Sequence, residues 1–477
     1  MEAIENFVGT INGIVWGWPM IIFLVGTHIF LTIRLKFIQA HVFKGIKLTF
    51  SKDTEASGDV TQWGALATAL SATFGTGNIV GVATAVVRGG PGAVLWLWFT
   101  GLFGIATKYG EALLAIKYRV KTSNGLMLGG PMYAIERGMN MKRLGILFAV
   151  FTAIACFGIG NLVQINSITV NLINTFANPN NLDVEDPSFL TMKLVIGIVL
   201  MILTFICIVG GIKTIAKVAE WLIPIMAIFF FICCLFILLY NGSYIGRALG
   251  EIFKGAFSFH AITGGMTGYA VMQAARFGIA RGLFSNEAGL GSAPIAAAAA
   301  VTRNPVRQGL VSMSQVFWDT ICLCAVTGTM YVTCYLRWPE QFFVDGALIG
   351  GGTYAAQAFS NIPGGFGSYL LTLCVLLFAW TTTLGWGYYG ERSCEYIGGK
   401  KAVMPFKVVY SLAVFIGAIT SLNLVWDIAD TLNGMMAIPN LISLIALSGL
   451  LVKLTKEYLW DKNLDAIDPD PIMEIKN

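Results

Sequence analysis

The chain has 477 residues, of which 56% are hydrophobic and only 12% are charged. Ordinary globular proteins carry roughly 25% charged residues. So little charge cannot cover a soluble surface of this size, which argues against a cytosolic enzyme, a nucleic-acid-binding protein or a disordered chain. The composition favours a polytopic helical membrane protein, and the 54 glycines suit close helix packing in lipid.

Several apolar stretches are long enough to cross a bilayer as helices, which takes about 20 residues. Eleven spans are predicted, at residues 14–35, 62–87, 93–116, 144–176, 190–211, 218–240, 258–277, 309–335, 366–390, 405–421 and 424–452. With the N-terminus outside, the inner loops carry 25 Lys and Arg, including Arg276 and Arg281, and the outer loops carry five. This asymmetry predicts a multi-pass cell-membrane protein with a cytoplasmic C-terminus.

Glycine interrupts two of the predicted spans. The second span contains GTGN at residues 75–78, and the seventh contains a glycine-rich break at 262–269. Each break lies in the first span of a set of five. Because five is an odd number, the second set crosses the membrane in the opposite direction to the first. The pattern predicts an all-α membrane protein with one extra N-terminal helix and a 5+5 inverted repeat with two broken helices, typical of secondary transporters.

The predicted domain boundaries follow from this repeat. They are residues 1–59 (the extra helix and a cytoplasmic loop), 60–241 (the first repeat), 242–456 (the second repeat) and 457–477 (a cytoplasmic tail). The polar tail from Asp461 to Asn477 is expected to be disordered.

The first break offers groups that could bind both an anion and a cation. An unwound turn presents N–H groups to a carboxylate and freed carbonyls to a cation. Thr76 could hydrogen-bond a substrate carboxylate, and Asn78 could bind Na⁺ or instead hold two helices together. In the ninth span, Ala379, Thr382 and Thr383 share one helix face. They could form half of a Na⁺ site, unless the threonines only bond back to their own helix.

Other polar residues within the spans have open assignments. Gln164 is a candidate to contact the polar end of a substrate. Asp319, in mid-span, could serve an ion or a proton or could be a structural partner. Lys108 and Glu111 lie three residues apart and could pair on one helix.

The segment 276–300 is too polar for a good span and is predicted on the cytoplasmic side. It could be a short helical gate closed by Arg281 and Glu287, or an ordinary amphipathic connector.

Enzyme and cofactor motifs are weak in this sequence. The three histidines lie near no catalytic constellation, no GxxxxGK[ST] loop occurs, and the nine cysteines form no CxxC pair. We therefore expect no enzyme activity, no cofactor, no nucleic-acid partner and no obligate protein partner. A channel or sensor is the alternative from another class, although no filter-like segment is repeated.

Several motifs together resemble the alanine or glycine:cation symporter family over about residues 10–455. They are residues 64–85 around GTGN, 89–92 (GGPG), 106–112 (ATKYGEA), 129–133 (GGPMY), 158–164 (GIGNLVQ), 285–292 (SNEAGLGS) and 384–391 (LGWGYYGE). The resemblance implies inward transport of small amino acids with Na⁺, or sometimes H⁺. It also implies a fold similar to the bacterial leucine transporter.

The resemblance also implies roles for individual residues. Asn78 resembles a ligand of a Na⁺ ion next to the substrate. A second Na⁺ is expected between the carbonyls of Ser71 and Phe74 and the group formed by Ala379, Thr382 and Thr383. The residues predicted to contact the amino acid are Thr76, Gly77, Gln164, Gly265, Met266 and Trp386. The bulk of Met266 and Trp386 would leave room only for a short side chain, which favours alanine or glycine. A proton-coupled transporter of the same fold is the nearest alternative.

Overall fold

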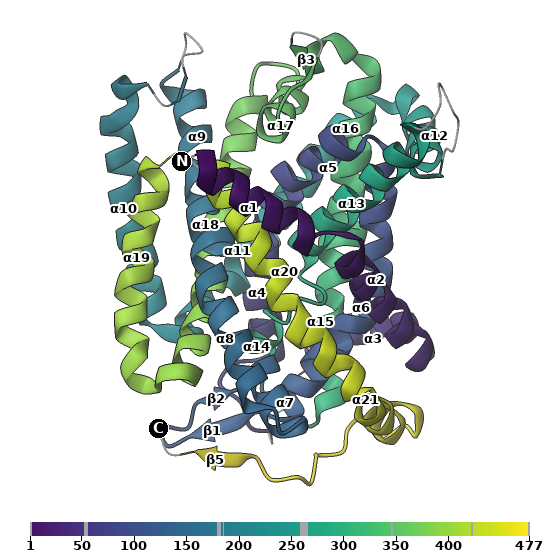
Figure 1. Cartoon of the computed structure of the whole chain (residues 1–477), viewed down its shortest axis with the longest axis vertical. Helices are drawn as coiled ribbons and strands as arrows, with labels where there is room; N and C mark the ends of the chain where they lie inside the picture. Colours follow the sequence, from purple (N-terminus) through teal and green to yellow (C-terminus); the bar gives the residue numbers. More distant parts are fainter. Residues whose placement is uncertain are drawn as a thin grey trace.

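The computed structural model describes residues 2–51, 56–178, 183–184, 186–257, 266–344, 347–420 and 423–475. It is a bundle of long helices, with the two chain termini toward opposite ends (Figure 1). The helices of the first half are α1 (Glu2–Val15), α2 (Trp18–Arg34), α3 (Val42–Thr49), α4 (Gln62–Thr73), α5 (Val82–Gly89), α6 (Gly92–Lys117), α7 (Pro131–Gly138), α8 (Lys142–Phe157), α9 (Val163–Phe176), α10 (Leu190–Val209) and α11 (Gly211–Tyr240).

The second half is also built almost entirely of helices. They are α12 (Gly242–Phe257), α13 (Met266–Asn286), α14 (Pro294–Ala297), α15 (Pro305–Val316), α16 (Ala325–Arg337), α17 (Gly351–Ser360), α18 (Gly367–Gly398), α19 (Val403–Ile419), α20 (Asn423–Ala446) and α21 (Ser448–Thr455). The π-helical turns are η2 (Gly77–Gly81), η3 (Gly158–Leu162), η5 (Phe317–Cys324) and η8 (Lys456–Trp460). The 3₁₀ turns are η1 (Ile38–His41), η4 (Pro187–Phe189), η6 (Pro339–Phe342) and η7 (Lys400–Ala402).

Among the described residues, short strands occur only in the connections and in the C-terminal tail. Strand β1 (Val120–Thr122) pairs with β2 (Met127–Leu128) and with β5 (Met473–Ile475). Strand β3 (Phe343–Val344) pairs with β4 (Ala347–Leu348). The prediction of an all-α polytopic membrane fold is therefore confirmed.

The number of spans can be compared with the predicted eleven. Within the described residues, eight helical stretches are long and apolar enough to cross a membrane, and nine if the bent pair Gln62–Thr73 and Gly77–Gly89 counts as one. The other two predicted spans correspond to α6 and to α13. The 26 residues of α6 extend about 39 Å at 1.5 Å per residue, enough to cross the hydrocarbon core. The count of eleven stays a prediction.

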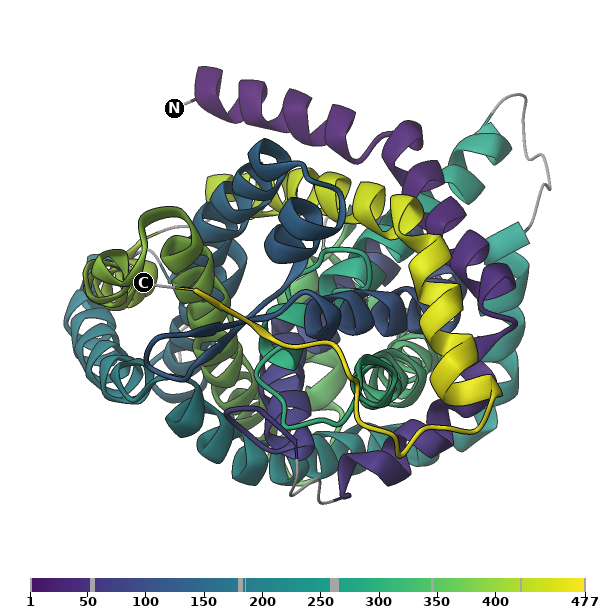
Figure 2. The same cartoon turned by 90° about the horizontal axis from the view of Figure 1, so that it is seen from below.

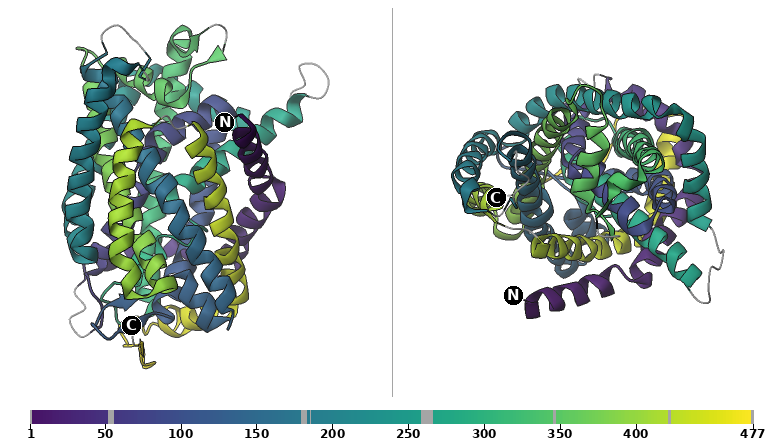
Figure 3. Two further views of the ribbon diagram at one scale, coloured as in Figure 1. Left: turned by 60° about the vertical axis from the view of Figure 1, so that its left-hand side comes forward. Right: turned by 90° about the horizontal axis from the view of Figure 1, so that it is seen from above.

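Helix α18 lies at the centre of the bundle, whereas α10 lies at its edge. The most apolar window of α18 is 72% buried, against 28% for the window that includes α10. Helix α18 packs against α4, α8, α9 and α11, while α10 and α19 lie side by side at the periphery (Figures 1 and 3). Because α18 is buried over most of its surface, its polar residues face protein.

The first predicted break is present in the structure. Helix α4 begins after Thr61, whose hydroxyl accepts a hydrogen bond from the Gly64 N–H, and it ends at Thr73. The chain then turns at Phe74, where φ is −75° and ψ is 84°, and continues through η2 into α5 at a bend of 50°. Phe74 leaves the helical conformation, so the carbonyls at this end lose their helical donors.

The second predicted break, at 262–269, lies only partly within the described residues, and it stays a prediction. Residues 258–265 lie outside the described part of the chain, so Ile262 and Gly265 are not placed. From Met266 onward the chain is helical, and this helix runs unbroken to Asn286. A separate interruption, here called the second break, follows at 287–293, where φ is +55° at Glu287, +98° at Gly289 and +81° at Gly291. Gly289 and Gly291 adopt this left-handed conformation without strain.

The segment 276–300 is too buried for an amphipathic connector, and it contains no gate formed by an Arg281–Glu287 pair. It comprises the last part of α13, the second break and α14, and residues 281–300 are buried. Arg281 pairs with Asp430 of α20 instead of Glu287, through an Nη2–Oδ2 contact of 2.6 Å. The polar residues misled the prediction because their partners come from distant helices that no local pattern shows.

The C-terminal tail is ordered in the structure, against expectation. It crosses one end of the bundle (Figure 2) and adds β5 in parallel to β1. The Asn304 side chain donates to the carbonyls of Leu464 and Ala466, both at 2.8 Å. Lys117 forms ion pairs with Asp468, at 3.1 Å, and with Asp470. These contacts compensate the low hydrophobicity on which the prediction of disorder rested.

Candidate functional site

The first break and the central helix α18 meet where the sequence predicted a sodium site. The Thr382 hydroxyl lies 3.2 Å from the Phe74 carbonyl oxygen, across the contact between α4 and α18. The two helices approach so closely that a Cβ on Gly385 would lie 2.8 Å from Ser71 Oγ. Thr382 and Ser71 are both almost fully buried. The structure thus joins the two predicted halves of this region.

The alternative role of the threonines is also seen. Thr382 donates to the Phe378 carbonyl at 2.9 Å, and Thr383 donates to the Ala379 carbonyl at 3.0 Å. Each hydroxyl therefore bonds back to its own helix. Hydroxyl oxygens keep acceptor lone pairs after donating, so these bonds leave Thr382 and Thr383 able to face a cation.

The predicted substrate residues gather on the other side of the first break. The Thr76 backbone N–H donates to Gln164 Oε1 at 3.2 Å, and Gln164 Nε2 donates to the Ile159 carbonyl at 2.8 Å. Trp386 is 1% exposed and packs directly on Gly160 of η3. The Thr76 hydroxyl is buried and has no hydrogen-bond partner among the described residues. An unused buried hydroxyl is the group a polar ligand would engage.

Two predicted substrate residues can be checked only partly. Gly265 lies outside the described residues, and Met266 begins α13 without a described side chain. Gly77 packs against α13, since a Cβ at this position would lie 3.1 Å from Phe284 Cδ1. The first break is therefore held between α18, η3 and α13.

Asn78 connects the first break to a buried carboxylate. Its Nδ2 donates to Asp319 at 2.7 Å and to Ser285 at 3.1 Å, while its Oδ1 accepts from the Gly75 N–H at 3.1 Å. Asp319 also accepts from the Ser285 hydroxyl, at 2.9 Å, and from Thr320, also at 2.9 Å. The partner of Asp319 is thus the break itself, which the sequence did not indicate.

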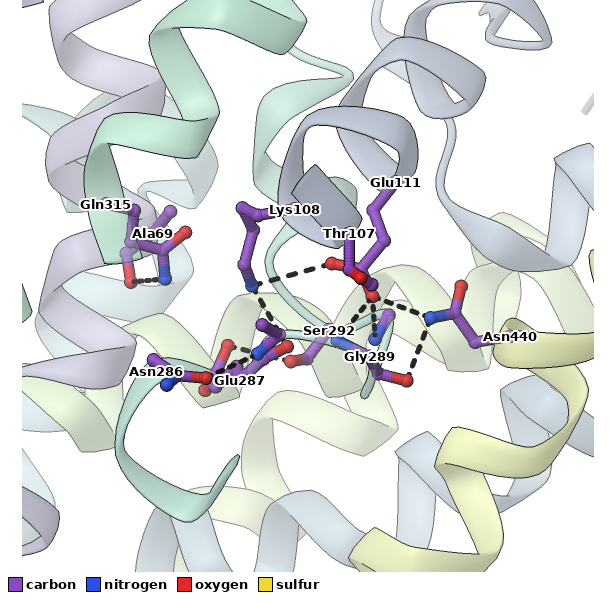
Figure 4. Close-up of polar contacts among 12 residues, drawn as sticks. Ala69, Thr107, Lys108, Glu111, Asn286, Glu287, Gly289, Ser292, Gln315 and Asn440 are labelled. Atoms are coloured by element: carbon purple, nitrogen blue, oxygen red, sulfur yellow. Dashed lines mark hydrogen bonds and ion pairs between the residues drawn. The ribbon is translucent and has the colours of Figure 1, made fainter. Parts of the chain in front are cut away.

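The second break is held by charged residues of α6 (Figure 4). Glu111 Oε1 accepts from the N–H groups of Gly289 at 2.9 Å and Gly291 at 3.1 Å, and from Asn440 Nδ2 at 2.6 Å. Lys108 donates to the Glu287 carbonyl at 3.0 Å and lies 3.6 Å from Glu111, which confirms the predicted pair. The pair thus satisfies one carbonyl and two N–H groups of the interrupted segment, which have no helical partners there.

A cavity of about 780 Å³ opens beside Arg281 and Asp430 at one end of the bundle. Arg88 and Gly351, which lie in predicted outer loops, line it together with Arg276 and Arg281. The predicted inner placement of these two arginines is therefore wrong. They lie within or near α13 at the end that also carries the predicted outer loops.

The cavity reaches Val80 of η2 but not the residues predicted to contact the substrate. Neither Thr76 nor Trp386 lines it, and both are almost fully buried. The bidentate contact of Arg281 with Asp430, at 2.6 and 3.4 Å, forms part of the cavity wall. Asp430 is further held by Trp16, whose indole N–H donates to its carbonyl at 2.9 Å.

Together the broken helices and the buried polar groups define a class of protein. A bundle that unwinds a helix beside its most buried helix, away from lipid, is typical of secondary transporters with a leucine-transporter-like fold. The crystal structure of MhsT in complex with L-phenylalanine matches this fold, with a TM-score of 0.57 over 86% of this chain and 93% of that chain, at 15% identity.

The chain belongs to the sodium:alanine symporter family, whose family model matches residues 1–470. It is 48% identical to the sodium/alanine symporter AgcS of Methanococcus maripaludis, over 95% of this chain and 97% of that protein. It is 32% identical to the probable sodium/glutamine symporter GlnT of Bacillus subtilis, over 97% of this chain and 92% of that protein. The chain is therefore a multi-pass membrane protein and a sodium-coupled amino-acid symporter, not an enzyme.

Proposed function

We propose that the chain imports alanine or glycine together with Na⁺ by alternating access. The observation that carries the proposal is the buried contact between the Phe74 carbonyl and the Thr382 hydroxyl. It places a freed helix carbonyl and a hydroxyl of another helix next to one another. Such neutral oxygens suit a weakly bound monovalent cation that must be released in each cycle, as Na⁺ is here the cargo.

Two Na⁺ positions follow from this arrangement. One lies between α4 and α18, with oxygen ligands from Ser71, Phe74, Ala379, Thr382 and Thr383. The other lies at Asn78, where the neighbouring Asp319 carboxylate would compensate the positive charge. In the described residues no three His, Cys, Asp or Glu side chains gather as a metal cluster. The proposed positions therefore depend on carbonyls, hydroxyls and one amide.

The amino acid would bind at the first break. Its carboxylate would accept hydrogen bonds from the backbone N–H groups of Thr76 and Gly77 and from the Thr76 hydroxyl. It would displace the present hydrogen bond between the Thr76 N–H and Gln164. Its amino group would donate to Gln164 and to freed carbonyls. Trp386, packed on Gly160, limits the space for a side chain, which supports a small substrate. Gly265 and Met266 stay proposed pocket residues.

We also propose the orientation of the chain in the membrane and the two halves that move during transport. The N-terminus would lie outside and the C-terminus in the cytoplasm, so that the cavity at Arg281 and Asp430 faces outward. That ion pair would close the outer path. The halves 60–241 and 242–456 would rock against one another as the inverted repeats.

Uptake into proteoliposomes tests the proposal. Labelled alanine should accumulate when a Na⁺ gradient is imposed and should not when Na⁺ is replaced by choline. Uptake that ignores Na⁺ would refute it, and flux that never exceeds equilibrium would favour a channel. Replacing both Thr382 and Thr383 by alanine should raise the Na⁺ concentration for half-maximal uptake at least about tenfold, or about 1.4 kcal/mol. An unchanged Na⁺ requirement would contradict the assigned position.

A further inference from the structure

Three buried carboxylates lie near the two breaks, and they differ in how they are held. Glu111 accepts three hydrogen bonds and lies beside Lys108. Asp319 accepts from Asn78, Ser285 and Thr320. Glu287 accepts a single side-chain hydrogen bond, from the Ser292 hydroxyl at 2.7 Å. Among these three, Glu287 is the least stabilised as an anion.

The second oxygen of Glu287 has no partner. Glu287 is 1% exposed, and its Oε1 is buried with no hydrogen-bond partner in the described part of the chain. The same holds for the hydroxyl of Tyr389 on α18, a fully buried residue within electrostatic reach of Glu287 and Glu111. A buried phenol without an acceptor and a buried carboxylate oxygen without a donor are both costly. A water molecule alone would leave the negative charge in place.

The surrounding charges do not neutralise Glu287. Lys108 supplies one positive charge, and it lies 3.6 Å from Glu111 while it contacts only the backbone carbonyl of Glu287. The His28 ring packs against Gly289 and donates to or accepts from Thr107. The titratable and charged groups that face Glu287 are thus Lys108 and Glu111 of α6, Asp319 of η5, His28 of α2 and Tyr389 of α18.

A proton would resolve the imbalance. A protonated carboxyl keeps one oxygen as acceptor, for Ser292, and turns the other into a donor. It also removes the one negative charge that no cation balances, since an uncompensated buried charge costs several kcal/mol. Under the proposed function, Na⁺ would compensate Asp319 and Lys108 already compensates Glu111.

We propose that the Glu287 carboxyl group is a proton-binding site of the transport cycle. It is protonated in the conformation described here, and it exchanges this proton with water when the second break opens. Its position at the first residue of that break, with φ +55°, ties protonation to the conformation of the break. The inference rests on the proposed function and adds a proton to the Na⁺-driven cycle.

The test uses the full-length protein in proteoliposomes that hold a pH-sensitive dye. With a Na⁺ gradient imposed, addition of alanine should acidify the interior. At pH values above the midpoint of the pH profile, the uptake rate should fall about tenfold per pH unit, because the protonated fraction of the Glu287 carboxyl falls by the same factor. Glu287→Gln keeps the shape of the protonated group, and it should transport with no dye signal and a flat pH profile. The matched control Glu251→Gln, at a partly exposed glutamate of α12, should behave as the wild type.

The outcomes separate the inference from the proposed function. Na⁺-driven uptake without proton movement in the wild type would overturn the proton site and leave the proposed function intact. A dye signal without Na⁺ dependence would overturn the proposed function and leave the proton site intact. A dye signal that persists in Glu287→Gln would also overturn the site. If that variant does not fold, Tyr389→Phe replaces it, and an unchanged pH midpoint in Tyr389→Phe would then count against the proton site.

Discussion

A single methyl group at Gly385 should separate the two helices that form the proposed sodium position. Gly385 lies on α18, three residues after Thr382 and therefore on the same helix face. An alanine Cβ there would lie 2.8 Å from both Ser71 Oγ and the Ala72 Cβ, and 2.9 Å from the Ala72 backbone nitrogen. A hydroxyl can rotate away, whereas a backbone nitrogen and a Cβ move only with the helix.

The size of the effect follows from these distances. Ordinary van der Waals contact begins at 3.4 Å, so α4 must retreat by about 0.6 Å. Added to the 3.2 Å between Thr382 Oγ1 and the Phe74 oxygen, this shift gives about 3.8 Å, too long for a hydrogen bond. Overpacking of this kind costs about 1–3 kcal/mol. If that cost falls on the ion-bound state, Na⁺ affinity drops about 5- to 150-fold.

The assay measures alanine uptake against Na⁺ concentration, together with thermal stability in detergent. Gly385→Ala should shift half-maximal Na⁺ upward by that factor while the protein stays folded. The control is Gly26→Ala on α2, where no atom lies within 4 Å of an added Cβ. A Na⁺ dependence in Gly385→Ala equal to that of the control would refute the reasoning that the α4–α18 spacing sets ion affinity.

Two further predictions concern the two ends of the bundle. Arg281→Ala or Asp430→Ala should speed the release of bound labelled alanine by on the order of tenfold. A variant with the two charges exchanged should release alanine slowly again. Equal release rates in all variants would argue against an outer closure by this ion pair. At the other end, the hydrogen bond and charge of Lys117 hold the pKa of the Asp470 carboxyl below its usual value. The stabilisation of the tail by the ionised Asp470 is therefore present at neutral pH, and it is lost as the pH falls through that lowered pKa. A spin label on the tail should become more mobile in acid, and Asp470→Asn should reproduce this at pH 7; a label that is equally mobile under both conditions would contradict the role of the ion pair.

The sequence was sufficient to predict the first break and its partner face because both are local patterns. Gly75 and Gly77 follow the residue where α4 ends, and Asn78 comes directly after them in the sequence. On α18, positions three and four residues apart must share a face, whatever the rest of the fold does. The structure adds that these two local features meet, as the contact between Phe74 and Thr382 shows.

The interruption at 287–293 was not predicted, because the contacts that hold it are not local. The charges at 276–300 argued against a span, yet Arg281 finds Asp430 at a separation of 149 residues, and Glu111 reaches Gly289 over 178 residues. The tail was misjudged for the same reason, since Lys117 lies 351 residues from Asp468. Composition describes a segment alone, and these segments are ordered by partners that only the tertiary fold supplies.

The two breaks also differ in what they leave available, which bears on where the amino acid binds. At the second break, the N–H groups of Gly289 and Gly291 already donate to the buried Glu111 carboxylate. A substrate carboxylate would have to displace a charged acceptor that is held by Lys108. At the first break, the N–H groups of Gly75 and Thr76 donate only to neutral side-chain amides. Hydrogen bonds to a charged group are about twice as strong as those between neutral groups, so a substrate carboxylate gains by replacing an amide at the first break and gains nothing at the second.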